Sequence, residues 1–287
     1  MKINKVFPDK HTYLQPVCEI AKPPRHLYVA GALPEQRIPT IAIIGTRKPT
    51  SYGREVTATL SQNLAKKGII VVSGLALGTD GIAQLAAVES GGVSIGILGN
   101  PLPDIRPATN RHIAEKILKS GGAIISEYGP DDDYTVGKWS FLERNRLVAG
   151  LSDAILITEA STKSGTLNTA ARALEQGKEV FVVPGNITSP ASAGCNLLLR
   201  QGATPVTRAE DIIEVLLPEA ASTQVSLPLG GTPLESDIIA LLFSGTRDGD
   251  EIRSQLGVSA AELNIALTML EIAGTIRSIG GNQWMLR

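Results

Sequence analysis

Between residues 38 and 217, short apolar runs alternate with longer amphipathic stretches. The apolar runs predict strands at 39–45, 69–73, 93–98, 123–127, 154–159 and 179–183. The amphipathic stretches predict helices at 53–67, 79–90, 109–120, 143–151, 166–177 and 209–217. Continuously apolar strands separated by helices are typical of a parallel sheet that is covered on both faces. We therefore predict an α/β protein with a doubly wound, extended Rossmann-like parallel sheet.

The segments that flank this pattern predict three further parts. Residues 1–37 are proline-rich and too short for a core of their own, so we expect an arm that packs on the main domain. Residues 218–232 have the composition of a linker. Three short helices at 234–243, 248–256 and 259–273, followed by a hairpin at 275–286, have the order of a winged helix. We thus divide the chain into an arm (1–37), a Rossmann-like domain (38–217), a linker (218–232) and a small C-terminal winged-helix-like domain (233–287).

The loops after the first two strands carry anion-binding chemistry. In parallel sheets the carboxyl ends of the strands meet at one edge, where ligands bind. Thr46 and Arg47 precede a helix start, whose N–H groups and dipole attract anions, and a guanidinium suits phosphate. An ordinary strand–helix turn with a solvated arginine explains these residues equally well. In the second loop, which begins at Ser73, Gly74 and Gly78 permit close backbone approach, and we expect Asp80 to cap the next helix rather than act in catalysis.

Two further loops combine cations with rings and hydroxyls. Residues 138–146 mix cations and aromatics as a single-stranded nucleic acid requires, and the candidates are Lys138, Phe141, Arg144, Asn145 and Arg146. The alternative places the aromatics in the core and pairs the arginines with Glu143 or Glu159. After the fifth strand, Lys163, Ser164 and Gly165 again precede a helix.

No catalytic constellation emerges from the sequence. The three histidines lie outside these loops, and the two cysteines fit neither a metal site nor a disulfide framework. The dinucleotide and P-loop patterns are absent. We therefore expect a binding protein with no catalytic residues, no metal and no cofactor.

The charge and hydropathy of the sequence limit where DNA could bind and which cellular compartment we expect. The net charge is −1, but residues 1–37 carry +3, residues 38–217 carry 0 and residues 218–287 carry −4. A polyanion site must therefore be a local patch, and the tail is the least suited to DNA because its helix at 259–273 has no Lys or Arg. We expect the tail to contact a protein, to regulate or to stabilise. No apolar run could span a membrane or serve as a signal peptide, so we expect a cytoplasmic protein without membrane contact.

Together these loops resemble the DNA-processing protein A (DprA, or Smf) family. The similarity runs from about residue 24 to residue 217. It rests on the segments Ile44–Arg47, Ser73–Ala76, Ile97–Gly99, Arg144–Ser152, Glu159–Ala160, Ser164–Thr166 and Val183–Gly185. The resemblance implies a homodimer that binds incoming single-stranded DNA in natural transformation on the 38–217 domain and loads the RecA recombinase onto it. It also implies DNA contacts by Arg47, Lys138 and Phe141, whereas Leu77 stands where relatives carry a basic residue.

The sequence also predicts a dimer interface and leaves a second function open. Leu197, Leu198 and Leu199 offer more apolar surface than one helix face can bury, so we expect them at the dimer interface, although a wholly internal helix is the alternative. The rival function is a phosphoribohydrolase of the LOG ("lonely guy") type, or a nucleotide sensor using the same pocket. LOG enzymes resemble this fold but carry a catalytic Glu in a PGGxGTxxE loop, and residues 164–169 lack it.

Overall fold

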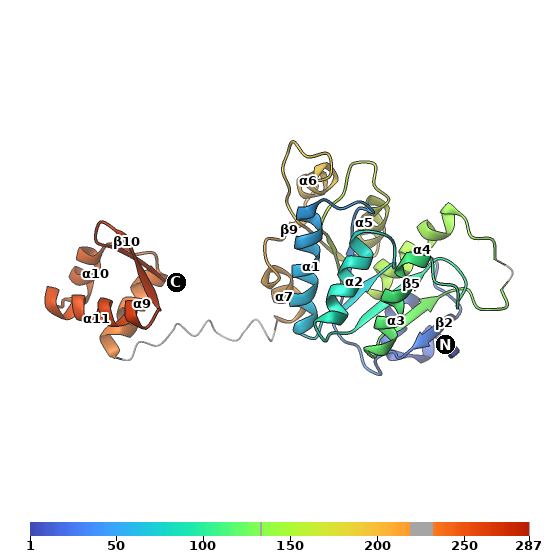
Figure 1. Cartoon of the computed structure of the whole chain (residues 1–287), viewed down its shortest axis with the longest axis horizontal. Coiled ribbons are helices and arrows are strands. Elements are labelled where there is room, and N and C mark those ends of the chain that lie inside the picture. Colours follow the sequence, from blue (N-terminus) through green and yellow to red (C-terminus); the bar gives the residue numbers. More distant parts are fainter. Residues whose placement is uncertain (133, 219–231, 287) are drawn as a thin grey trace. The chain divides into compact units, whose positions relative to one another are not determined.

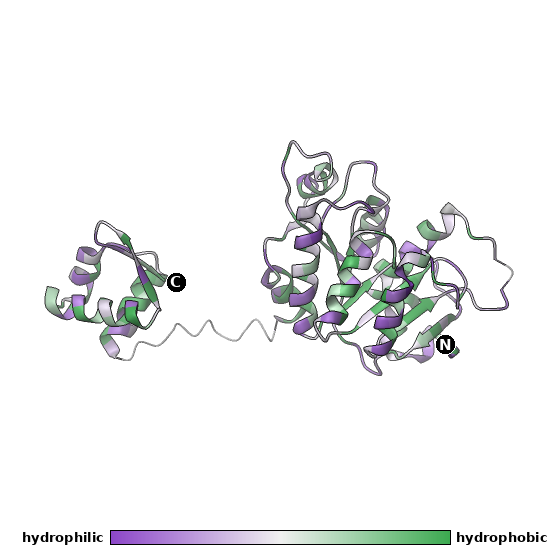
Figure 2. Cartoon of the chain, in the orientation of Figure 1, coloured by the Kyte–Doolittle hydropathy of each residue, from purple (hydrophilic) through white to green (hydrophobic). Residues whose placement is uncertain are grey.

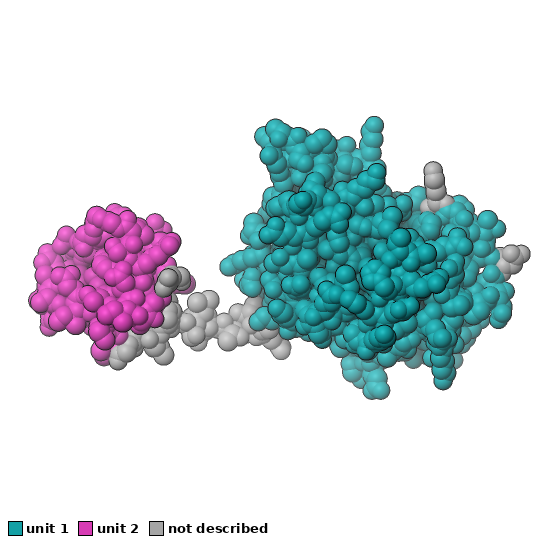
Figure 3. Space-filling model, viewed as in Figure 1, with its two compact units in different colours: residues 1–220 teal, residues 221–287 magenta. Residues whose placement is uncertain are grey.

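The computed structural model describes residues 1–132, 134–218 and 232–286, without the side chain of Lys138. The chain forms two compact units, Met1–Ala220 and Ala221–Arg287 (Figure 3). Except for its first and last residues, the predicted linker at 218–232 lies outside the described residues. No described helix has both the length and the apolar character needed to cross a bilayer.

A nine-stranded sheet forms the centre of the first unit, in the order β1-β2-β6-β5-β4-β3-β7-β8-β9 (Figure 1). Six central strands run parallel and confirm the predicted strands to within two residues: β3 (Thr40–Ile44), β4 (Ile70–Ser73), β5 (Ser94–Leu98), β6 (Ala123–Ser126), β7 (Ala154–Ile157) and β8 (Glu179–Val182). A short β9 (Thr204–Pro205) extends one side in parallel. At the other side, β2 (Leu27–Gly31) and β1 (Ile3–Val6) pair antiparallel.

Helices cover both faces of this sheet, because successive strand residues point to opposite sides. One face carries α1 (Ser51–Lys66), α2 (Thr79–Glu89), α3 (Arg111–Lys119) and α7 (Glu210–Leu216). The other carries α4 (Lys138–Leu151), α5 (Thr166–Glu175) and α6 (Ala193–Arg200). Ile41 and Ile43 pack against the first layer, and Ala42 and Ile44 against the second. The apolar strands are accordingly enclosed by helices whose polar residues face outward (Figure 2).

Helix α4 begins five residues before the predicted start at 143. The N–H of Gly137 donates to the Ser140 hydroxyl at 2.9 Å, which stabilises the first turn. This early start brings the aromatic segment 139–141 into the helix, so its side chains are distributed around the helix axis.

Residues 1–37 are part of the core of this unit. A 3₁₀ helix at Thr12–Cys18 buries Tyr13, Leu14 and Val17 in the layer under α4. The Tyr13 hydroxyl and the Thr40 hydroxyl are hydrogen-bonded at 2.9 Å, and burial raises the pKa of Tyr13 to about 12. The first segment of the chain therefore supports the start of β3.

The second unit has the winged-helix order expected from its sequence. Its elements are α9 (Pro233–Phe243), α10 (Gly249–Leu256), α11 (Ala260–Ile272), β10 (Ile276–Gly280) and β11 (Gln283–Leu286). Ile238, Ile252 and Leu267 are buried in a core that is separate from that of the first unit. Capping boxes of Thr232 with Glu235 and of Ser259 with Glu262 begin α9 and α11.

The run Leu197–Leu199 on α6 does not form the exposed patch that the dimer prediction assumed. Leu198 is 6 % exposed and belongs to the core, while Leu199 packs against the same cluster. Leu197 is half-buried. Consecutive helical residues point about 100° apart, so three in a row cannot share one outer face. This corrects the interface assignment for Leu198, whereas that for Leu197 and Leu199, both of which are half-buried, stays a prediction.

We predict that Leu14→Ala lowers the free energy of unfolding of the first unit by about 2–5 kcal/mol, because the truncation leaves a cavity in a packed layer. The measurement is urea unfolding followed by Trp139 fluorescence in a Trp284→Phe background. The control is Ile187→Ala, whose side chain is 90 % exposed and should change stability by less than about 0.5 kcal/mol. Equal effects of the two substitutions would contradict a core role for the first 37 residues.

Candidate nucleic-acid interface

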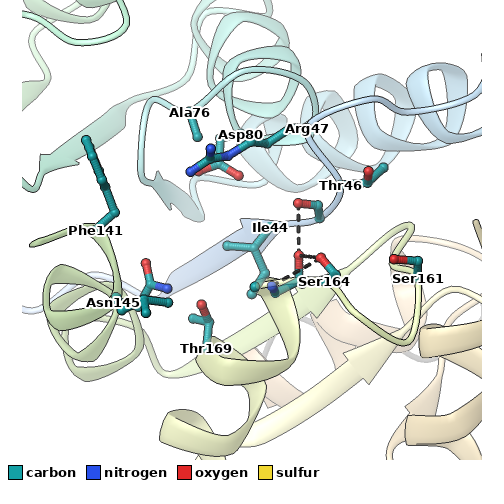
Figure 4. A pocket seen from close by; sticks show the side chains of 14 residues that line it. Ile44, Thr46, Arg47, Ala76, Asp80, Phe141, Asn145, Ser161, Ser164 and Thr169 are labelled. Atoms are coloured by element: carbon teal, nitrogen blue, oxygen red, sulfur yellow. Dashed lines mark hydrogen bonds between the residues drawn. The ribbon is translucent and has the colours of Figure 1, made fainter. Parts of the chain in front are cut away.

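The candidate site lies where the direction of winding reverses. Strands β3 to β6 succeed one another on one side, and α4 then crosses the opposite face to β7, which pairs with β3. Loops after β3 and β7 therefore diverge and leave a crevice, the usual ligand position in such sheets. A cavity of about 570 Å³ is present there (Figure 4). Its walls are Ile44, Gly45, Thr46, Arg47, Ala76, Asp80, Phe141, Leu142, Asn145, Ser161, Ser164, Gly165, Thr166 and Thr169.

The loop after β3 has a fixed backbone and a free cation. The Thr46 N–H donates to the Glu159 carbonyl at 2.8 Å, and its carbonyl accepts from the Thr79 N–H at 3.1 Å. Gly45 is required for this approach, since a Cβ there would lie 2.6 Å from the Thr79 hydroxyl. The Arg47 side chain is exposed, and the described residues offer it no ion-pair partner.

The loop after β4 turns inward. The Ser73 hydroxyl donates to the Ile43 carbonyl at 2.7 Å, and the Gly74 N–H donates to the Asp80 carboxylate at 3.0 Å. Both residues are buried, which corrects their prediction as DNA contacts. Asp80 is not the helix cap that we expected, because Gly78, with a positive φ of 78°, occupies that position. Asp80 instead holds the preceding loop from the first turn of α2.

Two buried amides complete the support of this loop. Leu75 has a φ of 53°, in the left-handed region. Its N–H donates to the Gln84 side-chain oxygen at 3.1 Å, and its carbonyl accepts from the Asn110 amide at 2.9 Å. No motif in the sequence points to Gln84 or Asn110. Neither lies in a loop motif, so only the fold reveals that they reach the loop.

Arg144 is buried beneath the same loop. Its guanidinium donates to the Gly74 carbonyl at 2.8 Å and also to the Ile97 carbonyl. Burial lowers the pKa of Arg144 to about 10, the Asp80 carboxylate opposes this shift, and nearby Arg47 adds to it. Burial likewise raises the pKa of the Asp80 carboxyl, against the attraction of Arg144. This corrects the prediction that Arg144 contacts DNA, because its donors are used inside the protein.

The side chains of Phe141, Asn145 and Arg146 on α4 do not all point toward the cavity. Phe141 and Asn145 line the cavity. Arg146 points elsewhere and pairs with Glu127 at 2.6 Å and Glu143 at 3.3 Å, as the alternative for the arginines proposed. Its predicted DNA contact is therefore corrected to an ion pair. Lys138 is the first residue of α4, and its side chain lies outside the described part of the chain.

Hydroxyls tie the loop after β7 to the loop after β3. The Thr166 hydroxyl donates to the Gly45 carbonyl at 2.9 Å, and the Ser164 hydroxyl donates to Thr166 at 2.8 Å (Figure 4). Lys163 and Gly165 are exposed, and a Cβ at Gly165 would meet open space. Gly165 precedes α5, whose N-terminal dipole favours an anion, while the N–H groups of Thr166, Leu167 and Asn168 are already bonded within the turn to Ser164 and Gly165.

The buried carboxylate of Glu159 belongs to the scaffold of the cavity. It accepts hydrogen bonds from the Thr50 N–H and hydroxyl, both at 2.8 Å, at the start of α1. It pairs with neither arginine of α4, contrary to the alternative raised from the sequence. Within residues 1–132, 134–218 and 232–286, no three His, Cys, Asp or Glu side chains gather as a metal site would need. Arg47 and the hydroxyl groups that line the cavity suit an anion, and the Phe141 ring suits a flat apolar group.

Two family models match the chain. The model of DNA recombination-mediator protein A matches residues 4–217, and that of the DprA winged helix domain matches residues 218–282. These ranges include the cavity and the C-terminal helices, respectively.

Curated relatives and solved structures agree with these matches. Protein Smf of Escherichia coli is 36 % identical over 278 residues, which are 92 % of this chain and 72 % of Smf. DprA of Bacillus subtilis is 40 % identical over 176 residues, 61 % of this chain and 58 % of that protein. A structure of DNA processing protein A from Helicobacter pylori, concerned with its single-stranded DNA binding mode, is 34 % identical with a TM-score of 0.67, covering 76 % of this chain and 97 % of that one. The Streptococcus pneumoniae DprA structure has 32 % identity and a TM-score of 0.68, with 75 % of each chain covered. The chain belongs to the DNA recombination-mediator protein A family, whose members are named DprA or Smf.

Proposed function

We propose that this protein binds single-stranded DNA at the cavity between β3 and β7, protects incoming DNA in natural transformation and loads RecA onto it. The observation that carries the proposal is the grouping of an exposed guanidinium, which has no ion-pair partner among the described residues, with several hydroxyls and an aromatic ring around one crevice. The Helicobacter pylori relative, which binds single-stranded DNA, supports the choice of ligand.

Each exposed group has a role in this proposal. Arg47, Lys163 and the N-terminus of α5 attract phosphates, as would Lys138, and Thr46, Ser164 and Gly165 lie between them. Phe141 offers a ring on which one base stacks. A base in a duplex is already stacked and paired, so this arrangement favours the single strand. Arg144 is a positioning residue that holds the wall carrying Phe141.

The proposal also includes RecA loading and self-association of the chain. The description of the matched family as a recombination mediator supports RecA loading. We retain Leu197 and Leu199 as candidate dimer contacts on α6, since only Leu198 between them is buried in the core.

An enzyme of the LOG type or a nucleotide sensor is the second candidate. Asp80 is the one carboxylate among the described residues that line the cavity, and it is already bonded to Gly74 and attracted by Arg144. A general acid or base must reach the substrate, and this carboxylate is buried. Release of free base from nucleoside monophosphates would favour the enzyme, whereas saturable nucleotide binding that excludes DNA would favour the sensor.

The C-terminal unit has an apolar rather than a basic outer helix face. Ile265, Met269 and Ile272 lie at helical spacing on α11, and each is more than half exposed. Glu262 is engaged in the capping box, and Asn264 alone could contact a base. We infer that this unit contacts a protein or regulates the chain and does not read DNA.

We predict that Arg47→Glu weakens binding of a fluorescein-labelled thymidine oligonucleotide by at least about tenfold, because a charge-assisted contact contributes about 1.5–3 kcal/mol. Fluorescence anisotropy measures the affinity. Arg47→Ala should also reduce the slope of log K against log salt by about 0.7. Lys67→Glu is the matched control, since this exposed lysine ends α1 at the opposite edge of the sheet. Unchanged binding by Arg47→Glu would remove Arg47 from the site.

Phe141→Leu should cost about 1–3 kcal/mol of binding free energy, because leucine keeps the apolar volume but loses the flat ring. Phe141→Tyr retains the ring and should bind within about twofold of the parent chain. Calorimetric titration measures both, and thermal unfolding tests whether the fold is intact. Stacking is excluded if leucine and tyrosine bind equally well.

A chain that ends at Leu217 should keep its affinity for single-stranded and duplex DNA within about twofold, because the removed part carries a net charge of −4. Salt-dependent titrations of the short and full-length chains make the comparison. A several-fold loss of duplex binding together with a smaller salt slope would identify the C-terminal unit as a DNA reader.

A further inference from the structure

Trp139 exposes a large aromatic surface beside the cavity. It is the second residue of α4 and is 57 % exposed. A tryptophan ring is usually covered in a folded protein, and an exposed one often belongs to a binding surface. Phe141 follows two positions later and so lies about 200° away around the helix. The proposed stacking on Phe141 therefore leaves Trp139 unexplained.

The ring of Trp139 is supported from within the protein. The Tyr134 ring meets it edge-on, with centroids 5.4 Å apart, and the Tyr128 ring stacks on Tyr134 at 3.5 Å. Tyr128 lies two residues after the end of β6, and its N–H donates to the Ser126 hydroxyl at 3.1 Å. This aromatic cluster, Tyr128–Tyr134–Trp139, is thus attached to the sheet edge. A ring held in this way loses little conformational entropy when a flat ligand stacks on it.

Trp139 also adjoins the cavity wall. Leu142 lines the cavity and is exposed, and it lies three residues after Trp139, so the two side chains are neighbours on one side of α4. Two exposed apolar side chains, Leu142 and Trp139, therefore lie on one side of α4, and the first of them borders the cavity. The N-terminal end of α4, where Trp139 sits, favours a phosphate nearby.

Three carboxylates near this surface have partners, and the exposed Asp131 has none among the described residues. Glu127 and Glu143 pair with Arg146, and Asp132 accepts from the Gly129 N–H at 2.6 Å. The Arg146 ion pairs offset the charges of Glu127 and Glu143 and so reduce their repulsion of a DNA backbone, whereas the hydrogen bond to Asp132 supplies no opposite charge.

We propose that Trp139 is a second stacking platform, which holds a base further along the same strand than the one on Phe141. This inference rests on the proposed function and extends its DNA path beyond the cavity, over Leu142. The ligand is an unpaired base of single-stranded DNA, because only an unpaired base presents its face to an indole. An apolar partner protein that covers the same ring is the competing outcome of the test.

The test uses the indole itself as the reporter. The chain has two tryptophans, and Trp284→Phe leaves Trp139 as the only one. We expect a thymidine oligonucleotide to quench this fluorescence with the same Kd as anisotropy gives. Trp139→Leu should weaken binding by about 5- to 150-fold, the ratio that corresponds to loss of one stacked base, and Trp139→Tyr should recover most of it. Leu174→Ala, at an apolar residue that is 58 % exposed on α5, should change nothing.

The outcomes separate the inference from the proposed function. If the parent chain binds no oligonucleotide by anisotropy, both fail. If it binds and Arg47→Glu weakens binding, but Trp139 is not quenched and Trp139→Leu binds normally, the function stands and the platform is wrong. Quenching without weaker binding by Trp139→Leu would also overturn the platform, because the base would then be near the ring without stacking on it. That result would leave the surface to a protein partner.

Discussion

The buried guanidinium of Arg144 is the contact on which the cavity depends. It links α4 to the carbonyl ends of β4 and β5, through Gly74 and Ile97, while Asp80 holds the same loop from α2. Removing it would leave the carbonyl oxygens of Gly74 and Ile97 without this donor and the buried Asp80 carboxylate without a nearby positive charge, which is costly in a protein interior. Since Phe141 and Asn145 are on the same helix, this contact also determines where the cavity wall stands.

The remaining loops support one another in the same way. Thr166 bonds to Gly45, and Thr46 bonds to both Glu159 and Thr79, so the loops after β3, β4 and β7 form one connected structure. Backbone groups satisfied in this manner keep a loop in one conformation without a ligand. The exposed side chains of Arg47 and Lys163 extend from a fixed loop backbone. In the proposed function, binding of single-stranded DNA would therefore order the DNA and these two side chains but change the protein backbone little.

The sequence predicted the elements better than the directions of their side chains. Apolar runs of strand length and amphipathic stretches suffice for β3 to β8, because burial on both faces leaves a clear pattern. Arg144, Asn145 and Arg146 are adjacent in the chain, yet one lies inside, one faces the cavity and one pairs with acids, since each helical residue turns by about 100°. Leu197 to Leu199 differ for the same reason. Support by Gln84 and Asn110 depends on contacts between distant segments, which no local motif records.

Ultraviolet cross-linking of the full chain to a thymidine oligonucleotide, followed by mass spectrometry of the linked peptides, tests the central claim most directly. The account predicts that the cross-links fall within residues 44–47, 138–146 and 161–166, the segments that border the cavity. Cross-links confined to residues 232–286, or to the opposite edge of the sheet near Lys67, would contradict it.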